Sequence, residues 1–224
     1  MNQSRRQLAI AAAVTLLTGT AQAQFGNLGG LLGGGGKASG DVDTDVKTFL
    51  GKSINIEKTL NAAALAIVAA YASEADRAKL QGSLDEINKA TDPKEADAKF
   101  QAVSESTSAE MKKLAASSDL SAQTQGLSAA KQKQVAVGVG NFLWGALQAK
   151  DLVPTGQAVM KGVGGNPMNI TKVIPLKDAL PRLANAMSLA ADTIPQFVKV
   201  MQGANIKVAE VSSSSKEEKI ESLN

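Results

Sequence analysis

The chain of 224 residues contains no cysteine and no histidine. Without cysteine, disulfide bonds and a cysteine-linked lipid anchor are excluded, so a folded domain has to be held by buried apolar surface. The absence of histidine removes the most common metal ligand and the usual general base near neutral pH. Any catalytic site would therefore rely on carboxylates or on a serine–lysine pair, and we predict neither a metal nor a cofactor.

Aromatic residues are also scarce, with one tryptophan, one tyrosine and five phenylalanines. Sugar-cleaving enzymes built on paired carboxylates usually add aromatic platforms, so this composition does not favour them. The β-branched and aromatic runs that are typical of strands are scarce as well, whereas alanine, the strongest helix former, is abundant. The composition therefore predicts an all-α fold.

The first 23 residues have the features of a signal peptide. Two arginines precede the apolar stretch Leu8–Thr18, and Ala21–Ala23 is a small-residue cleavage site. We therefore expect cleavage near Ala23 and export to the periplasm or the cell exterior. Ser4–Leu8 also resembles a twin-arginine export signal, but the lack of later cofactor ligands favours general secretion.

The net charge is small once the signal is removed. Loss of Arg5 and Arg6 lowers the formal charge from +3 to +1, which implies no nucleic-acid partner. The charge is uneven, because residues 128–207 hold nine basic and three acidic side chains. This surplus could face an anionic lipid surface in a peripheral contact. The basic residues are scattered, however, which favours ordinary solvated faces.

The remaining chain divides into three segments. Residues 24–40 are dominated by glycine, which predicts a flexible linker. Residues 41–211 carry helical apolar patterns, and we expect a single domain of five to seven helices in an irregular bundle. Residues 212–224 begin with a serine run and continue with charged residues, which predicts a disordered tail.

Apolar side chains recur with helical spacing along most of the domain. Ala62–Ala72 has almost no polar side chain, so the helix over Ile56–Tyr71 should lie at the centre of the bundle. Polar residues predict a loop at Ser117–Gly126, and the glycines and prolines of Leu152–Pro175 allow at most one short helix, near Gln157–Lys161. Further helices are predicted at Leu80–Ile87, from Asp92 onward, at Ser128–Lys150, at Leu176–Ala190 and at Thr193–Gly203. Ile206–Val211 alternates in polarity and predicts a short strand or an extended arm.

Two glycine-containing segments lack the residues that nucleotide binding requires. Gly33–Lys37 has neither the first glycine of a phosphate loop nor the hydroxyl residue after its lysine. Val135–Gly140 lacks the third glycine of a dinucleotide loop and the acidic residue about 20 positions later. Neither segment therefore predicts a nucleotide site.

Two other patterns have simpler interpretations. Asp41, Asp43 and Asp45 have the spacing that opens a calcium loop, but the later glycine and glutamate are missing. We interpret them as carboxylates placed favourably near a helix N-terminus. Ser-x-x-Lys occurs at Ser128 and Ser213, about as often as chance predicts, and without the partner motif of penicillin-interacting enzymes.

The most unusual stretch is Val135–Leu147, where Asn141 is the only polar residue. Its three glycines cost a helix about 1 kcal/mol each relative to alanine, so something must offset them. Close approach of another helix is the favoured explanation, with Ala136 and Gly140 on the contacting face. A bound apolar ligand and a membrane surface are the alternatives.

These observations lead to one functional hypothesis and two alternatives. We expect an exported, non-enzymatic module of the cell envelope that binds a protein partner or a lipid or other apolar ligand through its second half, where methionines provide adaptable surface. The alternatives are a carboxylate- or Ser/Lys-dependent hydrolase and a structural or assembly subunit. The candidate contact residues are Gly138, Gly140, Phe142, Trp144, Met187, Phe197 and Met201.

Overall fold

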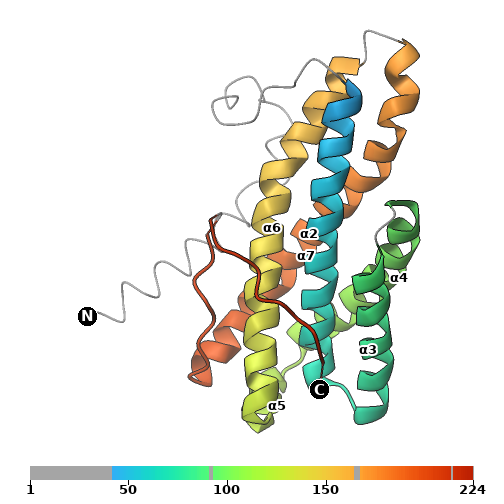
Figure 1. Ribbon diagram of the computed structural model, residues 1–224. Helices are drawn as coiled ribbons and strands as arrows, with labels where there is room; N and C mark the ends of the chain where they lie inside the picture. Colours follow the sequence, from blue (N-terminus) through green and yellow to red (C-terminus); the bar gives the residue numbers. More distant parts are fainter. Residues whose placement is uncertain (1–41, 91–92, 164–166, 213, 224) are drawn as a thin grey trace.

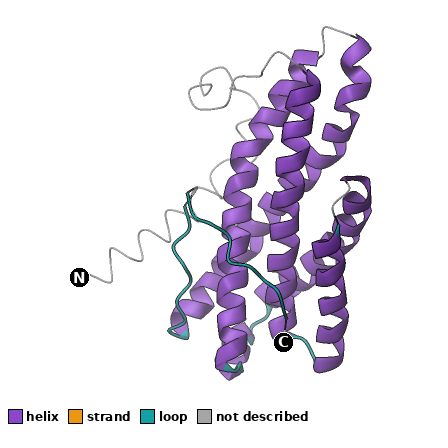
Figure 2. Cartoon of the chain, in the orientation of Figure 1, coloured by secondary structure: helices purple, strands orange, loops and turns teal. Residues whose placement is uncertain are grey.

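The computed structural model describes residues 42–90, 93–163, 167–212 and 214–223. Over these residues the chain forms six α-helices and one 3₁₀ helix, with no strand (Figure 2). The all-α prediction is therefore confirmed. The predicted signal peptide and glycine-rich linker, residues 1–23 and 24–40, lie outside the described residues.

Three long helices form the body of the bundle. α2 runs through the middle, α6 returns beside it, and α7 crosses behind them (Figure 1). A hairpin of α3 and α4 packs on the lower half of α2, and the short α5 leads into α6. The elements are α2 (Val42–Tyr71), α3 (Glu74–Lys89), α4 (Pro93–Ala116), α5 (Leu120–Gly126), α6 (Ala129–Val163), η2 (Pro167–Val173) and α7 (Ile174–Gly203).

The central position of α2 follows from its alanines. Every residue from Ala63 to Ala70 is buried, so this part of the helix is covered on all sides. Alanine is small enough for neighbouring helices to approach from several directions, and it costs the helix nothing in propensity. The helix α2 accordingly packs against α3, α4, α6 and α7. The prediction of a central helix over these residues is confirmed.

In the α3–α4 hairpin, each helix starts at residues that favour helix initiation. Ser73 caps α3, since its hydroxyl accepts the backbone N–H of Asp76 at 3.2 Å. The helix α4 begins at Pro93, as the sequence predicts. Lys99 and Glu86 join the two helices through an exposed ion pair of 2.8 Å. This ion pair lowers the pKa of the Glu86 carboxyl below its usual value.

Two segments predicted as loops are helical. α6 continues through Pro154 to Val163, although Leu152–Pro175 was expected to hold only a short helix. Its second half buries Leu152 and Val159, and this burial offsets the hydrogen bond that the proline removes. Within the predicted loop Ser117–Gly126, α5 forms because Leu120 and Thr124 are buried on the same face, one turn apart.

α7 is one continuous helix, whereas the sequence predicts two. Pro181 and Pro195 both lie inside it. Each removes one backbone hydrogen bond, but the buried residues Leu183, Ile194 and Phe197 next to them hold the helix against α2 and α6. Propensity alone predicts a break, and tertiary packing overrides it.

The end of α7 is closed by a Schellman motif. Asn205 has a left-handed backbone with φ of 56°, and the N–H of Ile206 donates to the carbonyl of Met201 at 2.8 Å. The sequence predicts that Gly203 ends this helix. Gly203 is indeed its last helical residue, but Asn205 takes the left-handed position.

The described residues after α7 form neither helix nor strand, and we divide them into an arm, residues 204–212, and a strap, residues 214–223. Ile206, Val208 and Val211 of the arm pack on the core, so Ile206–Val211 is an extended arm rather than a strand. The strap then crosses α6 and α2 and ends beside α3 (Figure 1). This docked path differs from the disorder that its serines and charges predict.

Candidate functional site

The predicted contact residues lie mainly in the core. Gly138, Gly140, Phe142, Phe197 and Met201 are buried, whereas Trp144 and Met187 are half-buried. Five of the seven candidate residues are therefore covered by the rest of the bundle in this structure. Only Trp144 and Met187 keep part of their surface available for a contact.

The glycines of α6 permit α2 to approach closely. A Cβ atom on Gly138 would lie 2.8 Å from Cγ1 of Ile67, and one on Gly145 would lie 2.8 Å from Cγ of Leu60. Gly140 has nothing within 4 Å of its hypothetical Cβ. The predicted contacting face through Gly140 is therefore wrong, because α2 packs on the face that carries Gly138 and Gly145, seven residues apart.

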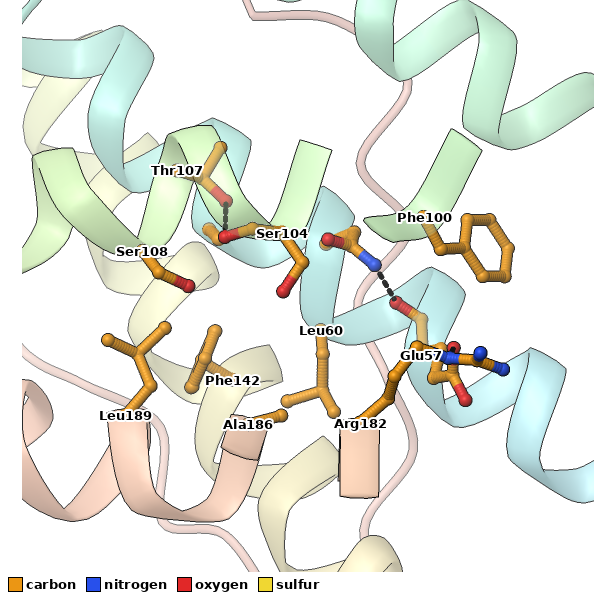
Figure 3. Close-up of a pocket in the computed structure, with 12 residues that line it drawn as sticks. Glu57, Leu60, Phe100, Ser104, Thr107, Ser108, Phe142, Arg182, Ala186 and Leu189 are labelled. Carbon is orange, nitrogen blue, oxygen red and sulfur yellow. Dashed lines mark hydrogen bonds and ion pairs between the residues drawn. The ribbon is translucent and has the colours of Figure 1, made fainter. Parts of the chain in front are cut away.

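A small pocket lies between α2, α4, α6 and α7 (Figure 3). Its charged wall is an ion pair of 2.9 Å between Oε2 of Glu57 and Nε of Arg182. The Glu57 side chain is only 6% exposed, and Oε1 also accepts the hydroxyl of Ser53 at 2.8 Å. Such a buried pair ties α2 to α7, and loss of one partner would leave a charge buried without compensation.

The remaining walls of this pocket combine hydroxyl and apolar groups. Ser104 and Ser108 of α4 direct their hydroxyls towards α2 and α7, while Leu60, Phe142 and Leu189 form the apolar side (Figure 3). The centre of a water molecule can move over only about 20 Å³, which is room for one or two waters. The pocket in this state is therefore too small for a lipid chain or a sugar.

The sequence patterns that suggest catalysis or metal binding have structural roles here. The Ser128 hydroxyl accepts the backbone N–H of Lys131 at 3.4 Å, which is a capping contact at the start of α6. Asp43 lies in the first turn of α2 and forms an ion pair of 2.6 Å with Lys172. No group of three carboxylates converges in a metal-binding arrangement within the described residues. Asp41 and Ser213 lie outside those residues.

A second site is the groove that holds the strap, and its main polar contact is Asn141. This α6 residue is 6% exposed and bonds twice to the backbone of Glu218. Its Nδ2 donates to the Glu218 carbonyl at 2.5 Å, and its Oδ1 accepts the Glu218 N–H at 2.9 Å. A side-chain amide thus replaces a neighbouring β-strand and satisfies both backbone groups of an extended residue.

Three further hydrogen bonds extend this groove over three helices. Nε1 of Trp144 donates to the Ser215 carbonyl at 2.7 Å, and Oε1 of Gln81 in α3 accepts the Leu223 N–H at 2.7 Å. Thr59 of α2 donates to the Glu217 carboxylate. Asn141, Trp144 and Gln81 therefore hydrogen bond to the strap backbone, whereas Thr59 bonds to the side chain of Glu217.

The far end of the groove is an apolar hole for Leu223. This residue is fully buried and packs with Leu65 of α2, Leu84 and Ile87 of α3 and Phe100 of α4. The half-buried Ile220 packs on the same cluster. The groove therefore combines hydrogen bonds to an extended backbone with one deep apolar anchor, a combination that suits peptide recognition.

Sequence reasoning identified only part of this groove. Trp144 was among the candidate contacts, and Asn141 was the one polar residue of its stretch. A buried side-chain amide in an apolar helix requires hydrogen-bond partners, and this requirement is the sign of the groove that the sequence contains. Those partners are about 70 residues away along the chain, in a segment whose composition predicts disorder.

One more polar pair lies at the lower end of α2. The hydroxyl of Tyr71 and that of Thr124 in α5 are 2.8 Å apart, and the Tyr71 ring lies 6.3 Å from that of Phe197. Burial raises the pKa of the Tyr71 phenol, so the group stays neutral and serves to join α2, α5 and α7.

Within the described residues, no helix has the combined length and hydrophobicity needed to cross a membrane. Comparison of the chain with protein-family models, with curated proteins and with solved structures gives no significant match.

Proposed function

We propose that this protein is an exported, non-enzymatic helical module that binds an extended peptide segment of a protein partner. The binding site is the groove formed by α2, α3 and α6. The observation that supports the proposal is the double hydrogen bond from Asn141 to one backbone residue of the strap. Because these bonds address backbone atoms, a foreign peptide in the same extended conformation can make them too.

The groove also provides a basis for selectivity. Leu223 is five residues beyond the clamped Glu218, and Ile220 is two residues beyond it. A peptide ligand therefore needs apolar residues at these two spacings, of which the second fills the deeper hole. Leucine burial of this kind is worth about 1.5–3 kcal/mol, enough to discriminate strongly against a polar residue.

A peptide partner is favoured over a lipid for two reasons. Five of the seven candidate contact residues are buried among neighbouring helices, and the pocket between α2, α4, α6 and α7 has room only for water. In addition, the indole N–H of Trp144 donates to a backbone carbonyl of the strap, that of Ser215. The lipid alternative would instead require the basic second half of the chain to bind an anionic membrane surface.

The direct test is binding of a labelled peptide with the sequence of residues 214–223 to the full-length Leu223→Asp protein, whose own strap is weakened. We expect saturable binding by fluorescence anisotropy, and at least a tenfold loss with a peptide that itself carries Leu223→Asp, as a loss of about 1.4 kcal/mol implies. No binding of the unmodified peptide would refute the proposal. Sedimentation with anionic liposomes at low salt, without peptide binding, would instead favour the lipid alternative.

Export has its own test. We expect protein recovered from the periplasm or medium to begin at Gln24, since Ala21–Ala23 has the small-residue pattern of a cleavage site. Intact mass and N-terminal sequencing measure this directly. Recovery of an uncleaved chain from the cytosol would contradict the cellular part of the proposal and leave the binding groove unaffected.

A further inference from the structure

Thr59 of α2 contacts the strap in a different way from the other polar residues of the groove. The groove side chains of α3 and α6 hydrogen bond to backbone atoms, which nearly every residue type provides. Thr59 instead donates to the side-chain carboxylate of Glu217. A bond to a side chain depends on the residue type at that position of the peptide. Thr59 can therefore contribute to selectivity in a way that the backbone contacts cannot.

The surroundings of the Thr59 hydroxyl favour an ionised acceptor. Thr59 is only 7% exposed, so water has little access to its oxygen. The same oxygen lies 3.0 Å from the carbonyl oxygen of Asn55, one turn earlier in α2. Because a hydroxyl has a single proton to donate, the Asn55 carbonyl and the peptide side chain compete for it. An ionised carboxylate is the stronger acceptor of the two, whereas a neutral side-chain amide has no advantage over the helix carbonyl.

Resting on the proposed function of the groove, we propose that Thr59 selects partner segments with an acidic residue directly before the clamped residue. In the strap these two positions are Glu217 and Glu218. The apolar positions Ile220 and Leu223 complete the pattern. The partner is thus an extended segment with an acidic residue, an apolar residue three positions later and a leucine six positions later. Thr59 is a specificity-determining residue, because it changes which segment binds and leaves the backbone contacts intact.

The strap itself contains a matched acidic residue for comparison. The carboxylate of Glu221 pairs with Lys219 of the strap at 2.6 Å, and the Glu221 side chain is 71% exposed. Replacing Glu217 or Glu221 by glutamine removes the same charge from a peptide, but only the first change removes the ionised acceptor of Thr59. The two peptides therefore separate the effect of this hydrogen bond from the long-range effect of one negative charge.

The test uses labelled peptides of residues 214–223 and the full-length Leu223→Asp protein, and it measures affinity by fluorescence anisotropy. We expect Glu217→Gln in the peptide to weaken binding about fivefold, the size expected for the loss of one net hydrogen bond. We expect Glu221→Gln to change the affinity by less than about twofold, since exposed ion pairs contribute little. Equal losses from the two substitutions would overturn the selection.

Substitutions of Thr59 in the same protein show whether the preference originates at this hydroxyl. Thr59→Val keeps nearly the same shape and lacks the hydroxyl, whereas Thr59→Ser keeps the hydroxyl. The quantity measured is the ratio of the dissociation constants of the Glu217→Gln peptide and the unmodified peptide. We expect this ratio to fall to about one in Thr59→Val and to stay at about five in Thr59→Ser. An unchanged ratio in Thr59→Val would assign Thr59 a packing role and refute its role in selection.

The outcomes for Thr59 are distinguishable from those for the groove as a whole. If the unmodified peptide and the Glu217→Gln peptide bind equally well, the acidic preference is refuted while the peptide-binding function stands. If no peptide binds the Leu223→Asp protein, both proposals fail.

Discussion

The α2–α6 interface and the groove with its strap hold neighbouring parts of the same helices in different ways. At the helix interface, Gly138 and Gly145 remove side chains so that α2 can pack against the α6 backbone. At the groove, Asn141 and Trp144 project side chains that hydrogen bond to an extended backbone. The first contact depends on apolar packing alone, whereas the second combines hydrogen bonds to an extended backbone with one buried leucine.

This difference sets what each contact can do. A packed helix interface has no separate open state short of unfolding, because its residues are shared with the rest of the core. A strap held mainly through its backbone can leave and return while the bundle stays folded, in the manner of a local opening. The comparison therefore assigns stability to the helix interface and the proposed peptide binding to the groove.

The largest effect is expected at the buried ion pair beside the helix interface. Arg182→Ala leaves Glu57 buried without its cation and should lower the free energy of unfolding by about 3–5 kcal/mol. Urea unfolding followed by circular dichroism measures the loss. The control is the double variant Glu57→Gln with Arg182→Met, which removes both charges and should recover most of the stability. Equal losses in the single and double variants would show that the pair contributes through its packing alone.

The next effect separates two glycines that the sequence does not distinguish. Gly138→Ala brings a Cβ to 2.8 Å from the Ile67 side chain and 3.0 Å from the Ala63 carbonyl, so we expect destabilisation by about 1–3 kcal/mol. Gly140→Ala is the matched control, because open space surrounds its Cβ and the helix gains up to about 1 kcal/mol in propensity. Thermal unfolding of both variants tests the sign. The same sign in both would mean that α2 does not approach α6 at Gly138.

The comparison also explains which features the sequence could predict. Local composition predicts the helical class, the central α2 and the packing role of the glycine stretch. The helix preference of alanine and the free-energy cost of glycine in a helix both act within a single helix. The contacting face was assigned to Ala136 and Gly140 instead of Gly138, since face assignment needs the position of the neighbouring helix. The continuity of α6 and α7 through their prolines was missed for the same reason, as tertiary packing decides it.

The groove was harder to predict than the bundle. Its residues Gln81, Asn141 and Leu223 are far apart in the chain, and none belongs to a local motif. The strap has the composition of a disordered segment, and only its two apolar residues, Ile220 and Leu223, give it an anchor. Composition averages over the segment and so conceals the anchor.

A smaller global effect is expected when the strap is released. Leu223→Asp removes an apolar anchor worth about 1.5–3 kcal/mol, but the bundle remains folded and loses only part of that value on global unfolding. Fluorescence emission of Trp144, the only tryptophan, should shift to longer wavelength as its indole loses the strap. Exchange of the Glu218 amide should accelerate in the same sample. Lys216→Ala, at an exposed strap position, is the control and should change neither signal.

The smallest effect is expected at the junction between the two regions, where α7 gives way to the arm. Asn205 has φ of 56°, a conformation that costs a β-branched residue about 1–2 kcal/mol and asparagine much less. Asn205→Val should therefore lower the melting temperature slightly, and Asn205→Gly should leave it unchanged or raise it. If the strap opens independently of the bundle, neither variant alters Trp144 emission at room temperature. A shift of that emission in Asn205→Val would show instead that the end of α7 positions the strap, and the two regions would then have to be treated as one cooperative unit.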